Sequence, residues 1–215
     1  MLLIRPSTDA DMTACTAIYA QAVTRSTGTF ELQPPDAAEL ARRRDDVLAK
    51  GLPWLVVEAA GGAELAEPAE PAQTAASAAS AASATRPGAA PQVLGYAYAN
   101  PFRPRQAYRF CVEDSIYLDP AARGRGLGRL LLAELLARCE AAGARQMVAV
   151  IGDADNAGSI RLHAALGFTR AGVLKAAGWK FGRWLDVVLM QRPLGRGDDT
   201  APQGVPAAAG AAGRP

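Results

Sequence analysis

Arg123-Gly124-Arg125-Gly126-Leu127-Gly128 is the stretch that decides the fold of this chain. It follows an alternating strand pattern and runs directly into a leucine-rich helix pattern. Glycines let backbone N–H groups approach a ligand closely, and a helix N-terminus adds unpaired donors and partial positive charge. These properties predict a cradle for an anion such as a pyrophosphate, to which the arginines add charge. The alternative is that the glycines serve only the geometry of a strand-to-helix turn.

Two familiar phosphate-binding motifs do not match this stretch. The last glycine is not followed by Lys-Ser/Thr, so the segment is not a P-loop. The segment also lies past mid-chain, after several strands. No acidic residue ends a next strand about 20 residues further on, as a dinucleotide-binding fold requires.

The composition indicates one globular domain. The chain has 215 residues, half of them hydrophobic, which suffices for a substantial core. With 23 basic and 21 acidic residues the net charge is +2, which gives no argument for nucleic acid or a membrane as partner. Three cysteines without a CxxC pair and a single histidine, His163, argue against a disulfide framework and a metal site. No apolar run reaches the roughly 20 residues that cross a bilayer, and Met1–Pro6 lacks a signal-peptide layout, so we expect a cytoplasmic protein.

Hydrophobic periodicity predicts a sheet of mixed strand direction with helices, in the α/β or α+β class. Strands are expected at 2–6, 54–58, 93–98, 110–118, 146–151, 168–174 and 184–191. Helices are expected at 9–25, 36–51, 126–142 and 156–166. The core-facing stripe of the third helix is Leu127, Leu131, Leu135 and Cys139.

One internal segment breaks these patterns. Residues 59–92 are mainly Ala, Pro, Ser and Glu, and bury too little surface to offset their ordering entropy. We predict a disordered insertion between two strands that would otherwise form an antiparallel hairpin. Residues 195–215 share this composition and are expected to be a disordered tail. One domain is therefore expected over 1–194.

The order of the motifs resembles the GCN5-related N-acetyltransferase superfamily. The strand at 115–119 leads to Arg123-x-x-Gly126-x-Gly128, a helix and the strand at 146–151. Asn156 follows, with His163 seven residues on, and then Leu166-Gly167-Phe168. Within the superfamily, residues 148–152, 159–168 and 180–187 resemble the phosphinothricin N-acetyltransferases and the related methionine sulfoximine acetyltransferases. The resemblance covers roughly 3–194, interrupted only by the insertion.

This resemblance implies an α/β fold with a mixed, centrally splayed sheet flanked by helices. It implies an N-acetyltransferase that uses acetyl-CoA, without a metal, on the α-amino group of a small amino-acid-like substrate. It also suggests a homodimer, with no nucleic-acid or membrane partner. The residues it assigns to acetyl-CoA are Ile116, Tyr117, Leu118, Arg123, Gly124, Arg125, Gly126, Leu127, Gly128, Asn156 and Ser159.

Two catalytic residues are expected. An amine arrives protonated near neutral pH, so a partly buried carboxylate with a raised pKa must remove a proton, and the resemblance assigns this role to Glu113. A solvated carboxylate, or one paired with Arg109, is the alternative. Asp114 is the spare candidate, although it faces the other side of a regular strand. His163 stands where many superfamily members have a tyrosine; it would assist proton movement at the thiol or amine, or be purely structural.

The candidates for substrate binding are Phe30, Tyr108, Arg109, Lys180 and Arg183. An α-carboxylate and a tetrahedral side-chain head group call for arginine and backbone donors. Each of these residues could equally be a surface charge or a core aromatic. Two other functions also stay open at this point. One is acetylation of another amine, such as a peptide N-terminus or a polyamine, and the other is CoA binding without turnover.

Overall fold

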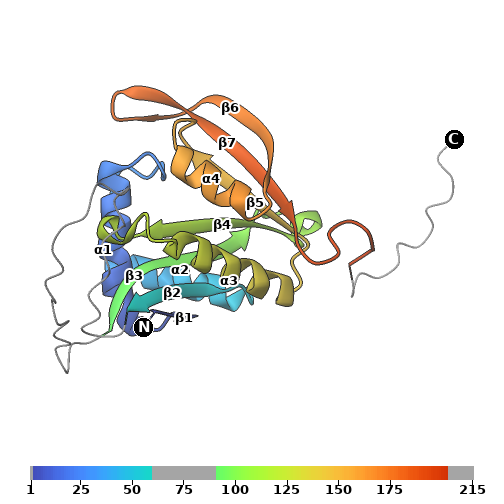
Figure 1. The fold of residues 1–215 in the computed structure, drawn as a ribbon, viewed down its shortest axis with the longest axis horizontal. Helices are drawn as coiled ribbons and strands as arrows, with labels where there is room; N and C mark the ends of the chain where they lie inside the picture. Colours follow the sequence, from blue (N-terminus) through green and yellow to red (C-terminus); the bar gives the residue numbers. More distant parts are fainter. Residues whose placement is uncertain (1, 60–90, 203–215) are drawn as a thin grey trace, which may run out of the picture.

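The computed structural model describes residues 2–59 and 91–202 (Figure 1). Its strands are β1 (Leu2–Pro6), β2 (Trp54–Ala59), β3 (Gln92–Pro101), β4 (Cys111–Leu118), β5 (Gln146–Gly152), β6 (Thr169–Lys180) and β7 (Arg183–Pro193). Its α-helices are α1 (Met12–Arg25), α2 (Ala37–Ala49), α3 (Leu127–Ala141) and α4 (Ala157–Ala165). Short 3-10 turns lie at Asp9–Asp11, Gln106–Tyr108 and Pro120–Ala122. Most of the expected insertion, and the tail beyond 202, lie outside the described residues.

The strands form one seven-stranded sheet in the order β1-β2-β3-β4-β5-β7-β6. In the described residues β4 and β5 pair in parallel, and the other neighbouring pairs are antiparallel. The predicted mixed sheet is therefore confirmed. The expected hairpin around the insertion is also present, because β2 and β3 are antiparallel and Ala59 pairs with Gln92.

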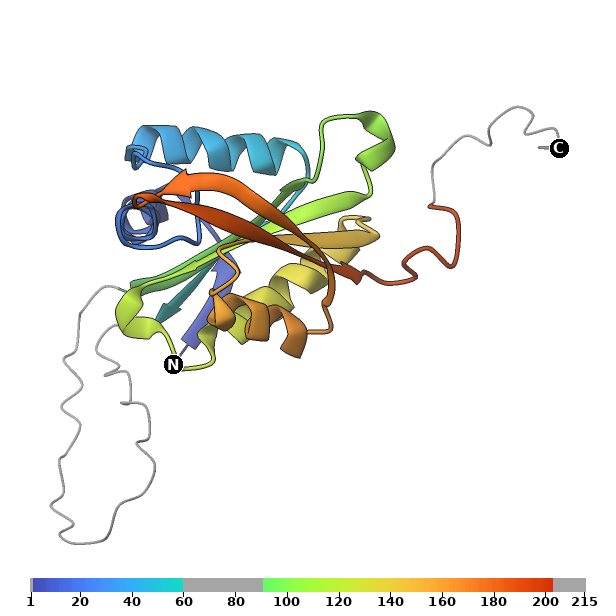
Figure 2. The same cartoon turned by 90° about the horizontal axis from the view of Figure 1, so that it is seen from above.

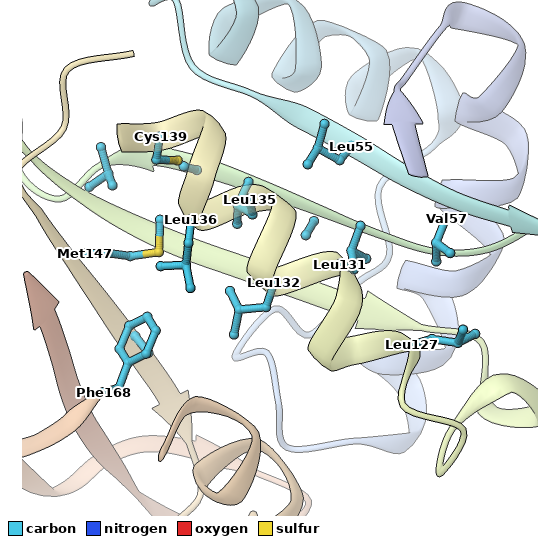
Figure 3. Close-up of a cluster of buried hydrophobic side chains, with 14 of the residues drawn as sticks. Leu55, Val57, Leu127, Leu131, Leu132, Leu135, Leu136, Cys139, Met147 and Phe168 are labelled. Atoms are coloured by element: carbon cyan, nitrogen blue, oxygen red, sulfur yellow. The ribbon is translucent and has the colours of Figure 1, made fainter. Parts of the chain in front are cut away.

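Helices cover both faces of the sheet (Figure 2). On one face α1 and α2 pack over Trp54, Val56 and Tyr96. On the other face α3 buries the predicted stripe, whose members are between 0% and 1% exposed (Figure 3). Each fully buried leucine of this kind stabilises the fold by about 1.5–3 kcal/mol. β4 therefore lies between the helices that cover the two faces of the sheet, and their packing holds it in place.

Local signals explain most of the element boundaries. Asp36 caps α2 by accepting a hydrogen bond from the N–H of Glu39. Asn156 caps α4 in the same way through the N–H of Ser159. The helix expected from residue 9 begins as a 3-10 turn instead. There Asp11 accepts from the N–H of Thr8 and leaves α1 to begin at Met12.

The last hairpin is longer than expected. The pattern suggested a strand only to residue 174 and a loop at 180–183, whereas β6 continues to Lys180. The Ala- and Gly-rich run at 175–178 hides the strand because it carries no alternating apolar side chains. Ala176 has a φ of 49°, and the register shifts between Leu174 and Gly178. The hairpin reaches across the molecule toward the end of α1 (Figures 1 and 2).

Residues 195–200 of the expected tail form turns against the domain. The guanidinium of Arg145 donates hydrogen bonds to the carbonyl oxygen and hydroxyl of Thr200, both at 3.0 Å. The ordered chain thus extends beyond residue 194. None of the helices in the described residues combines the length and the apolarity that a bilayer crossing requires.

Candidate active site

The site begins where the two parallel strands separate. β4 and β5 pair from Cys111 with Gln146 up to Asp114 with Ala149, and not beyond. The remaining part of β4 stays paired with β3. The gap opens into a cleft of about 610 Å³, lined by residues of the loop after α1, β4, β5 and the start of α4. The sheet is therefore splayed at its centre, as expected.

One edge of β4 is free along this cleft. Ile116, Tyr117 and Leu118 pair with Ala97, Tyr96 and Gly95 of β3 on one side. On the other side their backbone groups have no strand partner in the described residues, and all three residues line the cleft. Such an edge offers N–H and C=O groups to an extended ligand with amide groups, in the way that a sheet edge accepts another strand.

The glycine-rich stretch lies at one end of the same cleft. In the described part of the chain the backbone N–H groups of residues 124–128 donate no hydrogen bond. Gly126 is the N-cap of α3 and has a φ of 76°, which a β-branched side chain would strain. Arg123 and Gly124 line the cleft. Free donors at a helix N-terminus make this end a site that fits a phosphate anion.

The other residues of this stretch contribute differently. The Leu127 side chain is buried in the core, and a Cβ on Gly128 would lie 3.3 Å from a methyl group of Leu162. These two residues can therefore offer only backbone groups to a ligand. Among the described residues, Nε and Nη1 of Arg125 are buried without a hydrogen-bond partner. Arg125 as a whole is half-buried and does not line the cleft, so it adds positive charge beside this end of the cleft.

Glu113 lies at the point of separation, half-buried, and lines the cleft. Burial raises the pKa of its carboxyl group; the charge of Arg103 acts in the opposite direction, and Asp114 adds to the increase. The carboxylate accepts no hydrogen bond within the described residues. It is thus a carboxyl group with a raised proton affinity, free to exchange a proton with a molecule in the cleft.

Asp114 points to the opposite face, as expected for the next residue of a strand, and forms a buried pair with His163. Nε2 of His163 lies 3.0 Å from Oδ2 of Asp114, and Nδ1 lies 2.8 Å from the carbonyl oxygen of Ser159. Both side chains are 2% exposed. Each ring nitrogen faces an oxygen that can accept a hydrogen bond, an arrangement that favours the doubly protonated imidazolium. Burial, the largest single effect, lowers the pKa of His163, but the hydrogen bond to Asp114, the charge of Asp114 and the hydrogen bond to the Ser159 carbonyl together outweigh it, and the pKa is raised.

Asn156 and Ser159 line the cleft at the start of α4. The side-chain oxygen of Asn156 caps the helix, and this leaves its amide nitrogen available for a ligand. The hydroxyl of Ser159 lies 3.3 Å from Nδ1 of His163. The sequence left open whether Asn156 caps the helix or contacts a ligand, and its geometry permits both.

The expected substrate residues are not gathered in one place. Phe30 lines the cleft. Tyr108 and Arg109 lie on the exposed β3–β4 connection, where Arg109 stacks over Phe110. They are outside the cleft lining.

The two basic residues of the last hairpin are also engaged elsewhere. Lys180 is 4% exposed and donates to backbone carbonyls, and Arg183 forms an ion pair with Asp153. Neither lines the cleft. The basic rim suggested by the sequence is therefore not assembled from these residues.

Two features escaped the sequence reasoning. The charge of Arg103 acts on Glu113, although Arg103 precedes it by ten residues and lies in the β3–β4 connection. The second feature is a tyrosine wall, in which Tyr117 packs edge-on against Tyr19 with ring centroids 4.8 Å apart. The basic character of residues 103–109 could have signalled the first feature, whereas no local pattern joins Tyr19 to Tyr117.

A splayed sheet with a free strand edge, a helix start with free N–H donors and a carboxyl group of raised pKa match the site of an acyl-CoA-dependent acyltransferase. The family model described as "Acetyltransferase (GNAT) family" matches residues 65–168. A phosphinothricin N-acetyltransferase from Alcaligenes faecalis is 46% identical over 200 residues, covering 93% of this chain and 86% of that protein. A methionine sulfoximine/methionine sulfone acetyltransferase from Pseudomonas aeruginosa is 36% identical and covers 89% of this chain and 94% of its own.

Solved structures agree with these relatives. A phosphinothricin acetyltransferase from Sinorhizobium meliloti, crystallised with acetyl-CoA, is 44% identical with a TM-score of 0.77, and 95% of each chain is covered. An acetyltransferase from Salmonella typhimurium with its cofactor acetyl-CoA has a TM-score of 0.76 at 32% identity, covering 95% of this chain and 99% of its own. The chain belongs to the GNAT family, and it is an acetyl-CoA-dependent N-acetyltransferase. Its described residues include no cluster of His, Cys, Asp and Glu that could hold a metal ion.

Proposed function

We propose that this enzyme acetylates the α-amino group of a small amino-acid-like substrate such as phosphinothricin or methionine sulfoximine. The observation that carries the proposal is Glu113, a half-buried carboxyl group of raised pKa on the cleft. The names of the two relatives described above support the choice of acceptor. Acetyl-CoA supplies an activated acetyl group, so the protein needs to provide positioning, a base and polarisation of a carbonyl.

The roles of the residues follow from their positions. Glu113 takes a proton from the substrate ammonium, directly or through a water molecule. The free backbone edge at Ile116–Leu118 holds the extended arm of acetyl-CoA, and a backbone N–H near Leu118 stabilises charge on the thioester oxygen. The N–H groups of residues 124–128, with Arg123 and Arg125, hold the pyrophosphate. Asn156 and Ser159 complete the cofactor side of the cleft.

His163 is proposed to pass a proton to the departing thiolate through the hydroxyl of Ser159, which lies 3.3 Å from Nδ1 and lines the cleft, because both ring nitrogens already face protein oxygens. Its imidazolium lines the cleft opposite Glu113 and is held by Asp114. A positive charge at this place also stabilises a developing thiolate without moving. Glu113, the proposed base, and the Asp114–His163 pair lie on opposite faces of β4. The proton taken from the amine and the proton given to the sulfur are therefore handled at separate places.

Arg103 is the proposed partner of the substrate carboxylate. Its charge acts on Glu113, although its guanidinium stacks over Phe102 and the residue does not itself line the cleft. Among the described lining residues, the carboxylates are Glu113 and Asp114, and the latter is paired with His163. A polyamine would need more acidic groups than this to bind its several cations. The amino-acid-like acceptor is therefore favoured over a polyamine.

The experiment is a measurement of CoA thiol release from acetyl-CoA with one acceptor at a time. The acceptors are phosphinothricin, methionine sulfoximine, methionine sulfone, ordinary amino acids, a peptide N-terminus and spermidine. Turnover on the first three, well above that on the others, is the expected result. Turnover confined to the peptide or spermidine would replace the proposed acceptor, and acetyl-CoA binding without any turnover would support a CoA-binding module instead.

We also propose a homodimer, as the resemblance suggests. Trp179, Phe181 and Trp184 at the end of the last hairpin are between 55% and 63% exposed. Aromatic side chains exposed together in this way are typical of protein interfaces. Sedimentation equilibrium of the purified protein distinguishes a dimer from the monomer that would contradict this.

A further inference from the structure

The ammonium of Lys180 is bound inside the protein. It lies at the end of β6, is 4% exposed, and donates hydrogen bonds to the carbonyl oxygens of Ser26 at 2.8 Å and Thr29 at 2.7 Å. Both acceptors lie in the loop that follows α1, which we call the wall loop and define as residues 26–31. Lys180 therefore connects the last hairpin to a loop more than 150 positions earlier in the chain.

The wall loop forms one side of the cleft. Ser26, Gly28, Thr29 and Phe30 all line it, whereas Lys180 does not. Two ammonium donors are already used on backbone carbonyls, and the side chain is closed off from solvent. Any effect of Lys180 on a substrate must therefore pass through the wall loop rather than through direct contact.

The Phe30 ring packs against the same hairpin. A Cβ built on Gly178 of β6 would overlap the ring, and one built on Gly152 at the end of β5 would lie 3.0 Å from it. The ring thus occupies the space that both glycines leave by having no side chain. This close packing sets the position of the ring over the cleft together with the hydrogen bonds by which Lys180 holds the wall loop.

A third contact anchors the hairpin. Arg183, which pairs with Lys180 across the turn, forms an ion pair with Asp153, the residue after β5. Gly152, the residue before Asp153, lies so close to the wall loop that a Cβ built on it would overlap the carbonyl oxygen of Thr27. The hairpin end, the end of β5 and the wall loop therefore form one connected unit around the cleft.

We propose that Lys180 is a positioning residue that sets acceptor binding and selectivity by fixing the wall loop, and with it Phe30, over the acceptor end of the cleft. This inference rests on the proposed function for the identity of the acceptor. The acetyl-CoA end of the cleft, formed by β4, residues 123–128 and α4, has no contact with Lys180 among the described residues. Changes at Lys180 should therefore affect binding of the acceptor and leave binding of acetyl-CoA nearly unchanged.

The main test compares Lys180→Met with Lys175→Met. Methionine keeps the length of the side chain and removes the donors. Lys175 lies on the same strand and pairs with Asp186 at the surface, so it is a matched control. In Lys180→Met we expect KM for the acceptor to rise about tenfold or more, while KM for acetyl-CoA changes less than about twofold. The differences in kcat/KM among acceptors of different side-chain length should become smaller in Lys180→Met. Lys175→Met should match the wild type.

Two results would overturn the proposal. One is an unchanged acceptor KM and an unchanged acceptor preference in folded Lys180→Met. The other is an equal rise of KM for acceptor and acetyl-CoA, because that indicates general loosening of the fold. Partial recovery in Lys180→Arg, which restores donors, is expected if the hydrogen bonds are what matters.

A second pair of variants covers the case in which Lys180→Met does not fold. Gly178→Ala keeps Lys180 and pushes on the Phe30 ring, so it should also raise the acceptor KM selectively. In the double variant Gly178→Ala/Phe30→Leu the overlap is relieved, and the two effects should be clearly less than additive. Additive effects would mean that Gly178 does not act through Phe30, and the wall-loop proposal would be wrong.

Hydrogen exchange separates this inference from the proposed function. Faster exchange of backbone amides at residues 26–31 is expected in Lys180→Met, with no change in Lys175→Met. This measurement needs no acceptor. If the wild type acetylates none of the acceptors, the proposed function fails while the exchange result still tests Lys180. Unchanged exchange together with normal turnover by the wild type would refute the role of Lys180 alone.

Discussion

Asp114 and His163 meet at the register position where β4 and β5 stop pairing, with Oδ2 and Nε2 3.0 Å apart. The pair joins β4 to α4 beneath the cleft, and Oδ1 of Asp114 is buried without a partner in the described residues. Charges so deeply buried are stable only together, because each one alone would keep its desolvation cost. The point at which β4 and β5 separate therefore carries a buried ion pair, and the stability of this pair depends on the protonation of His163.

Protein stability should depend on pH through this pair. The folded pKa of His163 is raised above 6.5, so its contribution is fully present below the unfolded value and is lost as pH rises through the higher folded value. We expect His163→Gln to cost about 3 kcal/mol at about pH 6 and less at about pH 9. Urea unfolding at both pH values measures this, with Lys175→Gln as the surface control. An equal loss in the free energy of unfolding at both pH values would contradict the raised pKa of His163.

Removal of the proposed base should affect turnover and not cofactor binding. Glu113→Gln keeps the shape of the side chain and cannot accept a proton, so kcat should fall about a hundredfold or more. KM for acetyl-CoA should stay the same, because the cofactor end of the cleft is untouched. Glu134→Gln on α3, whose carboxylate pairs with Arg138 at the surface, is the matched control. Undiminished turnover of Glu113→Gln at neutral pH would exclude Glu113 as the base.

The pH profile should report the charge of Arg103. Burial raises the pKa of Glu113 above 4.5, so kcat/KM should rise with pH as this carboxyl group loses its proton. Arg103 opposes the raised pKa, so Arg103→Met should move the acid limb to higher pH and raise KM for the acceptor. Arg109→Met is the control. Arg103 stacks on Phe102 and Arg109 stacks on Phe110, and Arg109 lies outside the cleft. Equal shifts of the acid limb in Arg103→Met and Arg109→Met would show that the pKa of Glu113 responds only to the total positive charge nearby.

The glycine at the start of α3 should be needed for cofactor binding. Gly126→Val forces a β-branched residue to a φ of 76°, and Gly143→Val does the same at 91° at the other end of the helix. Each change should cost about 1–2 kcal/mol of stability through backbone strain. Only Gly126→Val should raise KM for acetyl-CoA, because only it displaces the free N–H groups. Isothermal titration with acetyl-CoA decides between this and a purely structural glycine, for which both variants would bind alike.

Much of the fold could be predicted because its signals are local. The stripe from Leu127 to Cys139 follows the helical period, and the run at 146–151 is that of a buried strand. The glycine turn and helix start at 123–128 could be predicted in the same way, because they depend only on neighbouring residues, and the anion-binding role stays a prediction. The end of β6 was missed, because Ala and Gly at 175–178 carry no pattern.

The amino-acid sequence by itself determined the elements, the core stripe and the residue types available for acetyl transfer. Only the tertiary structure decided which charges face the cleft. Lys180 and Arg183 looked like substrate residues, but the sheet order places them against the wall loop and Asp153. Arg103, which no motif marks, acts on Glu113 instead. The physical reason is that periodicity depends on immediate neighbours along the chain, whereas the environment of a charge depends on residues that the fold brings together from 10 to more than 150 positions away.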